Sequence, residues 1–304
     1  MTDMIKELIP IVDKSTKYEG INQTAMPFVQ FFKAFTTSQI LHTVYEPSLF
    51  IILQGAKIVT LGSHTYRYDP LSYLVSSVHL PVAGQIIEAS ESSPFLSIQI
   101  TFTPEQIYKI AEQLNYVNQA ESHETSIGIS MKEVGYELIE AVHRLICLSN
   151  KPTDIDILAP LYLQEVLYRL LQSDHAKTLM QFAPIESNAG RIAKSIQLIK
   201  KDLFQSISIQ ELADHVGMSI SSFHKHFKII TTMSPIQYRK LNRLQEARRL
   251  MLLKHLDVSD ASFQVGYESP SQFSREYTRY FGLPPSKDIK KIKEIWSSDL
   301  QKII

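Results

Sequence analysis

The chain has 304 residues, with 31 Lys and Arg against 31 Asp and Glu, and a length that suggests about two domains. Its 14 Phe, 14 Tyr and only 10 Gly exclude a disordered or fibrous protein. No apolar run approaches membrane-spanning length, the N-terminus lacks the pattern of a secretory signal, and a single cysteine, Cys147, fits a reducing compartment, so we expect a cytoplasmic protein.

Residues 49–102 are predicted to form a series of short strands. These segments are rich in Ile, Val, Tyr and Phe and are separated by Gly, Pro, Asp and Ser. They are Phe50–Leu53, Lys57–Leu61, Thr65–Tyr68, Tyr73–Val75, Gln85–Glu88 and Phe95–Phe102. Many short strands at a spacing of about ten residues indicate a barrel or a sandwich, and a small barrel can hold one small ligand.

Helical periodicity replaces the strand pattern after Thr103, a candidate N-cap that is followed by Pro104. Segments 133–148 and 161–180 carry apolar residues at helical spacing, which predicts helices that cover the sheet or form a dimer face. Residues 183–190 contain Pro, Asn and Gly and are interpreted as a linker.

The charge distribution separates the two halves of the chain. Residues 1–190 hold 12 Lys and Arg against 20 Asp and Glu, whereas residues 191–304 hold 19 against 11. A basic half suggests a polyanionic partner, although basic helices are often only solvated surfaces. Sequence motifs are needed to distinguish a polyanion-binding half from basic helices that are only solvated.

Residues 209–228 have the pattern of a helix-turn-helix. Ala213 is small where two helices cross, Gly217 supplies the turn, and Ser219 can cap the second helix. In that second helix, Phe223 and Phe227 share one face. The opposite face carries short polar and basic side chains that could reach base edges in a major groove.

A second copy of the motif occupies residues 258–277. Ser262 replaces the small Ala, Gly266 lies in the turn 49 residues after Gly217, and Pro270 suits the first turn of the second helix. Between the copies, residues 235–254 predict a helix about 30 Å long, close to the roughly 34 Å that separates successive major-groove faces. Such a rod could present two recognition helices one turn of DNA apart.

Residues 191 to about 288 resemble the double helix-turn-helix domain of AraC-type transcriptional regulators. The matching residues are Leu212-Ala213, Gly217-Met-Ser219, Phe223, Phe227-Lys228, Ser234-Pro-Ile-Gln-Tyr-Arg239, Arg243-Leu244, Ala247-Arg248, Val265-Gly-Tyr267, Gln272-Phe-Ser-Arg275 and Tyr280-Phe-Gly-Leu-Pro-Pro285. The chain departs from the family ending Pro-x-x-Tyr-Arg, since it has Pro285-Ser-Lys-Asp-Ile-Lys290 there.

The N-terminal half resembles the cupin-like sensor domain found upstream of this module in many bacterial regulators. The matching residues are Tyr45-Glu-Pro47, Leu53-Gln-Gly-Ala-Lys57, Leu61-Gly62, Tyr68-Asp-Pro70, Tyr73-Leu-Val75, Leu80-Pro-Val-Ala-Gly84, Glu88-Ala-Ser90 and Leu158-Ala-Pro-Leu161. The resemblance implies an α+β chain in four parts. These are a cupin-like β-barrel with covering helices for sensing and dimerisation over residues 1–182, a linker over 183–190, an all-α double helix-turn-helix domain over 191–290 and a basic tail over 291–304.

The resemblance also implies a function: a sequence-specific DNA-binding regulator, expected to be an activator that acts through RNA polymerase. The positions from which the family contacts bases are occupied here by Ser221, His224, Lys225, Ser271, Ser274 and Arg275. We expect Lys228, Arg243 and Arg248 to supply further phosphate or base contacts. We further expect a homodimer whose barrel binds an unidentified small-molecule effector, with no cofactor, catalytic residue or metal site.

The alternative is a metal-dependent cupin enzyme fused to a helical domain. Such a site needs several converging His and Glu ligands, whereas His42, His64 and His79 stand alone in the sequence. Cys147 lies among apolar helix residues and is expected to pack in the core rather than act as a sensor thiol. A scaffold protein would explain the amphipathic helices but not two matched basic recognition faces.

Overall fold

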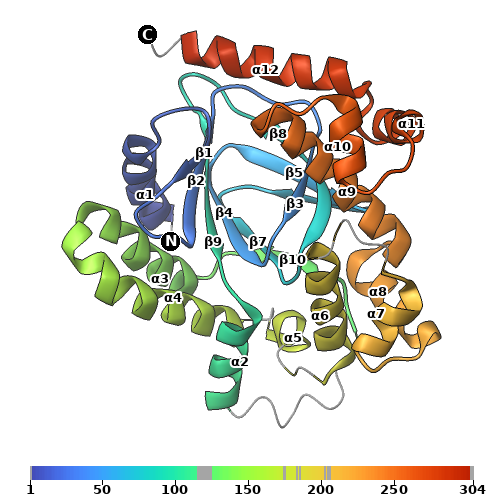
Figure 1. Ribbon diagram of the computed structural model, residues 1–304. Coiled ribbons are helices and arrows are strands. Elements are labelled where there is room, and N and C mark those ends of the chain that lie inside the picture. The colour runs from blue at the N-terminus through green and yellow to red at the C-terminus, as the bar shows by residue number, and fades with distance from the viewer. Residues whose placement is uncertain are drawn as a thin grey trace.

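The computed structural model describes residues 2–114, 125–173, 176–182, 184, 186–201, 203 and 207–301. Its N-terminal part combines ten strands and several helices (Figure 1). The strands are β1 Gly20–Gln23, β2 Val29–Ala34, β3 Leu41–Tyr45, β4 Ser48–Gln54, β5 Ala56–Leu61, β6 His64–Tyr68, β7 Ser72–Ser76, β8 Leu80–Glu88, β9 Phe95–Thr101 and β10 Ile129–Glu133. The helices are α1 Thr2–Ser15, α2 Pro104–Gln113, α3 Tyr136–Cys147, α4 Ile155–Gln172 and α5 Ala176–Met180.

The described strands form two sheets that enclose a barrel. One sheet has the order β1-β2-β9-β4-β7-β10 and the other the order β3-β8-β5-β6, and the strand pairs are antiparallel. Inward side chains of both sheets, among them Ile52, Leu74, Val59 and Val82, belong to one buried cluster. The α+β architecture predicted from the sequence is therefore confirmed.

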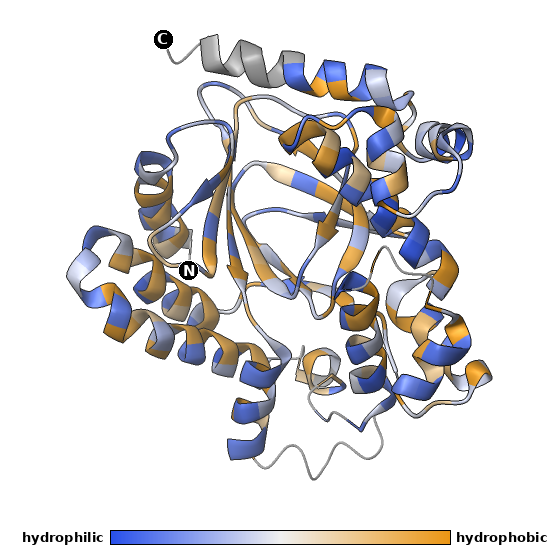
Figure 2. Cartoon of the chain, viewed as in Figure 1, coloured by the Kyte–Doolittle hydropathy of each residue, from blue (hydrophilic) through white to orange (hydrophobic). Residues whose placement is uncertain are grey.

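Helices cover the outer face of the larger sheet. α1 packs on β2, β4 and β9, α3 packs on α1 and α4, and the three helices share one apolar cluster with the sheet on this flank (Figures 1 and 2). α3 begins at Tyr136, later than the predicted 133, because Glu133 still pairs with β7. The predicted helix over 161–180 is two helices, since α4 ends at Gln172 and Ser173 adopts an extended conformation.

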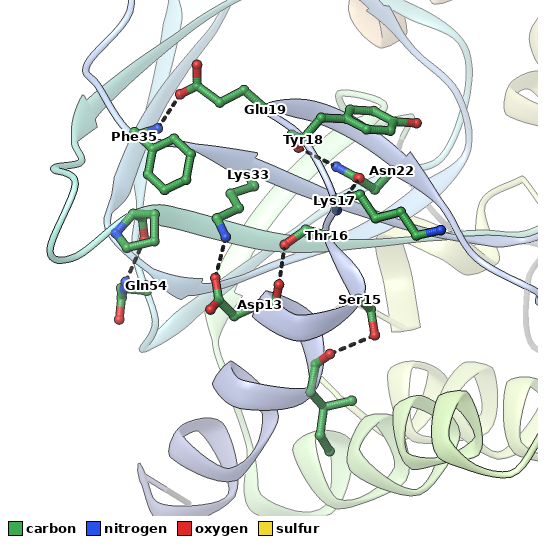
Figure 3. A network of polar contacts seen from close by, with 12 residues as sticks. Asp13, Ser15, Thr16, Lys17, Tyr18, Glu19, Asn22, Lys33, Phe35 and Gln54 are labelled. Atoms are coloured by element: carbon green, nitrogen blue, oxygen red, sulfur yellow. Dashed lines mark hydrogen bonds and ion pairs between the residues drawn. The ribbon is translucent and has the colours of Figure 1, made fainter. Parts of the chain in front are cut away.

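Polar contacts fasten the end of α1 to the barrel (Figure 3). Lys33 Nζ on β2 lies 2.6 Å from the Asp13 carboxylate. The Asn22 amide donates to the carbonyl of Tyr18, and the Glu19 carboxylate accepts from the Phe35 N–H. Together these bonds fix the chain entering β1 against β2.

The C-terminal part is helical. Its helices are α6 Asn188–Lys201, α7 Ile209–His215, α8 Ile220–Thr231, α9 Pro235–Leu253, α10 Val258–Gln264, α11 Pro270–Phe281 and α12 Pro285–Gln301. α6 begins within the segment interpreted as a linker, of which Ala183 and Ile185 lie outside the described residues. α12 runs past residue 291, where we expected the tail to begin; residues 302–304 of that tail lie outside the described chain.

Three apolar clusters hold the molecule together. The first joins the larger sheet to its covering helices. The second fills the barrel and continues into α6, α7 and α8, ending at Tyr238 near the start of α9. The third lies between the second half of α9, from Leu244 onward, and α10 and α11. The barrel and the first helix-turn-helix therefore share one core, and α9 spans two.

Candidate nucleic-acid interface

The first helix-turn-helix is built by α7 and α8. Gly217 in the turn has φ +64°, and the Ser219 hydroxyl accepts the Ser222 N–H to cap α8, as the sequence predicts. Phe223 and Phe227 are fully buried. Burying these two rings fixes the rotation of α8 about its axis, so the opposite face is presented outward.

The outward face of α8 carries the residues proposed to contact DNA. Ser221, Lys225 and Lys228 are exposed, and His224 is half-exposed. Neither lysine forms an ion pair within the described residues, so both ammonium groups face solvent. His226 points elsewhere, because its Nδ1 lies 2.8 Å from Thr125 Oγ1 beside the barrel.

The second helix-turn-helix repeats this arrangement in α10 and α11. Gly266 has φ +81°, and Ser269 caps α11 by accepting the Gln272 N–H. Phe273 and Tyr277 are fully buried and set the rotation of α11. The caps are 50 residues apart while the turn glycines are 49 apart, so the second turn is one residue longer.

Three predicted residues of this copy border one hollow on the surface. The hollow measures about 560 Å³ and lies between the starts of α10 and α11. It is lined by Val258, Ser259, Pro270, Ser271, Ser274 and Arg275. Arg275 is exposed and unpaired by carboxylates in the described part of the chain, so the hollow combines hydroxyl donors with one free positive charge.

Two arginines expected to contact DNA have structural roles instead. Arg248 forms a bidentate ion pair with Asp288, with both distances at 2.8 Å, and its side chain is only 14% exposed. Arg243 Nε donates to the carbonyl of Leu203, and burial lowers the pKa of its guanidinium. Helical spacing could not reveal this, because both partners lie 40 residues away in sequence.

The sequence did not predict the arginine hydrogen bonds that support both turns. Arg191 Nη1 donates to the carbonyl of Gly217 at 2.6 Å, and Arg243 Nη1 donates to that of Gly266 at 3.4 Å. Each turn carbonyl therefore accepts from a guanidinium on another helix, α6 or α9. No local signal marks these residues; only the repetition of the turn itself would direct attention to them.

The barrel contacts the DNA-binding helices directly. The Gly128 N–H donates to the carbonyl of Ile230 at 2.9 Å, and the Tyr238 hydroxyl donates to the carbonyl of His79 at 2.8 Å. His79 Nε2 lies 2.7 Å from Lys200 Nζ on α6. On the second module, the His42 ring lies 4.3 Å from the Tyr280 ring.

No metal centre is evident in the described residues, where no three His, Cys, Asp or Glu side chains group together. His42 and His79 instead take part in the contacts between the barrel and the helices.

Cys147 is half-buried, and burial, together with Glu7, raises the pKa of its thiol. A raised pKa disfavours the reactive thiolate, which agrees with a packing role. None of the helices in the described chain could cross a membrane.

These features define a class of protein: one that offers two matched recognition helices, joined by a helical rod, beside a β-barrel. Two family models match this chain. The AraC-type transcriptional regulator N-terminus matches residues 25–178, and a helix-turn-helix domain matches residues 212–291. The chain belongs to the AraC-type transcriptional regulators, which bind DNA.

Individual relatives agree with this assignment. The lactose operon transcription activator of Staphylococcus xylosus is 24% identical over 254 residues, covering 81% of this chain and 85% of that protein. The transcriptional activator RhaS of Escherichia coli O6:H1 is 23% identical over 158 residues, covering 52% of this chain and 56% of RhaS.

Solved structures show the same fold. ToxT of Vibrio cholerae with a bound unsaturated fatty acid has a TM-score of 0.59 and 12% identity, covering 86% of this chain and 93% of ToxT. ToxT bound to (E)-4-(8-methylnaphthalen-1-yl)but-3-enoic acid also has a TM-score of 0.59 at 12% identity, with 86% and 97% coverage.

Proposed function

We propose that the protein is a transcriptional activator that reads operator DNA with α8 and α11. The observation that carries this is the pair of recognition helices, each fixed in rotation by two buried aromatic rings and each presenting polar and basic side chains outward. α9 joins them with 19 residues, about 28 Å of helix. Its relatives RhaS and the lactose operon activator are activators, which supports the proposal that this protein activates transcription through contact with RNA polymerase.

In this proposal the exposed residues divide into two roles. Ser221, His224 and Lys225 in α8, and Ser271, Ser274 and Arg275 in α11, reach base edges. Lys228, near the end of α8, contacts phosphate. The chain acts where the chromosome lies, in the cytoplasm, and it is not an enzyme, since the relatives it matches are regulators.

The decisive experiment compares Arg275→Ala and Lys228→Ala on operator fragments that the full-length chain selects from its genome. Arg275→Ala should weaken operator binding by about 1–3 kcal/mol and reduce discrimination against random DNA. Lys228→Ala should weaken all sequences similarly and lower the salt slope by about one. Lys109→Ala, which removes an exposed lysine from α2, is the control.

An operator affinity unchanged by Arg275→Ala would remove Arg275 from the residues that contact bases. A sequence-selective loss in Lys228→Ala would contradict its phosphate role. If the chain selects no DNA fragments at all, operator binding itself is refuted.

We also propose that the barrel holds a small-molecule effector. Such a molecule shifts the arrangement of the DNA-binding modules only if it binds one arrangement better than another. The direct contacts from the barrel to Ile230, Tyr238 and Tyr280 provide the route. ToxT, which shares the fold, binds an unsaturated fatty acid.

Dimerisation through α4 completes the proposal. Ile157 and Leu161 are 71% and 56% exposed, and they lie one turn apart on the same face of the helix. Exposed aliphatic side chains at this spacing fit a second copy of the same helix, since a symmetric pair buries the same stripe on both chains.

A further inference from the structure

The Lys57 side chain points into the barrel because of the backbone conformation of residues 53–57. The Gln54 side chain donates to the carbonyl of Pro94 (Figure 3), and Gly55, at φ +82°, has no room for a Cβ, which would lie 2.4 Å from the carbonyl oxygen of Glu88. The pairing of β5 with β8 then shifts register between Ala56 and Lys57. These features set the phase of β5 at its first residues.

The phase of β5 places Lys57 on its inner face. Val59 and Leu61, two and four residues later, are fully buried between the sheets, and alternate residues of a strand share a face. The Lys57 side chain crosses Gly84 on β8, where an added Cβ would lie 3.0 Å from its Cε. Its stem therefore runs along the inside of the smaller sheet.

The ammonium of Lys57 lies between aromatic rings and lacks an anionic partner. Its Nζ is 5.5 Å from the centroid of Tyr45 and 5.9 Å from that of Phe32. No carboxylate within the described residues forms an ion pair with it. Ring faces attract a cation but do not neutralise it, so a half-buried positive charge remains uncompensated.

A second polar group lies under the same ammonium. Tyr45 is only 6% exposed, its ring stacks on Phe50 at 4.3 Å, and its hydroxyl lies beside that of the buried Tyr68 without a well-aligned hydrogen bond in the described part of the chain. Of two neighbouring phenol groups only one can donate to the other, so one O–H remains for an acceptor beside the unpaired ammonium. The neighbouring side chains are aromatic rings.

We propose that Lys57 and Tyr45 form the subsite for the acid group of an organic carboxylate whose apolar body lies against the rings. Lys57 supplies the charge, and Tyr45 donates its O–H, which remains available when the Tyr68 hydroxyl donates to Tyr45. One cation matches one carboxylate, and charge-assisted hydrogen bonds are the strongest that such a site can offer. This inference rests on the proposed effector role of the barrel and names the chemical class of the effector.

The test pairs acids with neutral molecules of the same body. Benzoate, hexanoate and decanoate are titrated calorimetrically into the full-length chain at pH 7.5, alongside benzyl alcohol, hexanol and decanol. At least one acid should bind the wild type more tightly than its alcohol. Lys57→Met should weaken that acid about 10-fold or more and leave the alcohol unchanged, Lys57→Arg should retain most affinity, and Tyr45→Phe should cost a few-fold.

Matched controls keep the outcomes distinct. Lys109→Met removes an exposed lysine from α2 and should change nothing, and thermal unfolding of each variant checks that it folds. Equal acid affinity in Lys57→Met, or no acid tighter than its alcohol, overturns the subsite. Operator binding measured on the same samples separates the two proposals: intact DNA binding without acid binding refutes only the subsite, and acid binding that leaves operator affinity unchanged refutes the effector role.

Discussion

Arg248 is a basic residue of the DNA-binding domain whose charge is neutralised by an ion pair within the protein. It pairs with Asp288, which is 4% exposed and also accepts the Tyr277 hydroxyl at 2.7 Å, and its guanidinium lies 4.4 Å from the Phe281 ring. These contacts join α9, α11 and α12. Charge alone therefore does not identify a DNA contact on this surface.

We expect Arg248→Ala to cost about 3 kcal/mol of stability, because it leaves the Asp288 carboxylate buried without its cation. The operator affinity of the folded fraction should change little. Arg249→Ala is the matched control, since Arg249 is half-exposed and pairs only with Glu246 on the same helix, so it should cost less than about 1 kcal/mol. Urea unfolding and operator titration measure both quantities; a large loss of affinity at unchanged stability would restore Arg248 as a DNA contact.

At the scale of elements, the turn between β5 and β6 rests on the end of α8. Gly62 has φ +59°, and an added Cβ would lie 2.5 Å from Thr232 Oγ1. Thr232 itself has φ +64°, which is unusual for a β-branched residue, and its hydroxyl is buried without a partner in the described chain. Barrel and recognition helix thus meet without spare room.

We expect Gly62→Ala to cost about 2–3 kcal/mol: roughly 1 for positive φ, the rest for the contact with Thr232. Gly20→Ala is the control, since Gly20 has φ +96° but open space around it, and should cost only the backbone part. Adding Thr232→Gly to Gly62→Ala should recover the contact part. Denaturant unfolding of the wild type, Gly20→Ala, Gly62→Ala, Thr232→Gly and the double variant tests this, and additive effects of Gly62→Ala and Thr232→Gly would show that the turn does not bear on α8.

The contact between the loop before β8 and α6 depends on a neutral imidazole. Burial, and then the Lys200 ammonium, lower the pKa of His79 to about 4. An unfolded chain protonates histidine near 6.5, so the folded state binds the proton less readily. The contribution of His79 to stability is thus fully present above pH 6.5 and is lost as the pH falls toward 4.

We therefore expect the wild type to lose stability between pH 6.5 and pH 4 more steeply than His79→Gln, which keeps a hydrogen-bond acceptor but cannot take up a proton. Urea unfolding of both chains across this range separates the effect of His79 on stability from that of the carboxylates, because the carboxylates are the same in both chains. Parallel pH profiles would mean that His79 is not held neutral in the folded protein.

For the whole molecule, the proposed α4 interface predicts a dimer. The double substitution Ile157→Asp and Leu161→Asp should weaken self-association about 30-fold or more, because it places carboxylates on the buried stripe of both chains. Ile236→Asp, at an equally exposed position on α9, should leave the dimer intact. Sedimentation over a concentration series measures the constants. A wild type that stays monomeric, or a double variant that dimerises normally, would rule out this interface.

What the sequence could predict follows from how locally each feature is encoded. Strands with strong Ile, Val and Tyr runs, from β4 to β9, were predicted. β1, β2, β3 and β10 were not. β1, β3 and β10 are edge strands of their sheets and expose many of their residues, which blurs the alternation, whereas β2 is an inner strand that lies outside residues 49–102, to which the strand prediction was limited. Capping serines and turn glycines act within a few residues, so the recognition helices were placed correctly.

Partners far apart in the chain could not be predicted in this way. The bonds of Arg243 and Arg248, the support of Gly217 by Arg191, and the approach of Gly62 to Thr232 all join segments distant in sequence. Periodicity reports only which face of a helix is apolar. It does not report which other element will meet that face.

The shared core has a consequence for how the protein comes apart. Because the barrel and the first helix-turn-helix share one apolar cluster, they should unfold as a single cooperative unit. The second module has its own smaller cluster and can melt alone. The border between the two lies inside α9, around Leu241, which contacts both clusters. Cutting the chain near residue 190, where its charge changes sign, would therefore split a folding unit, whereas hydrogen exchange should reveal the natural division halfway along one helix.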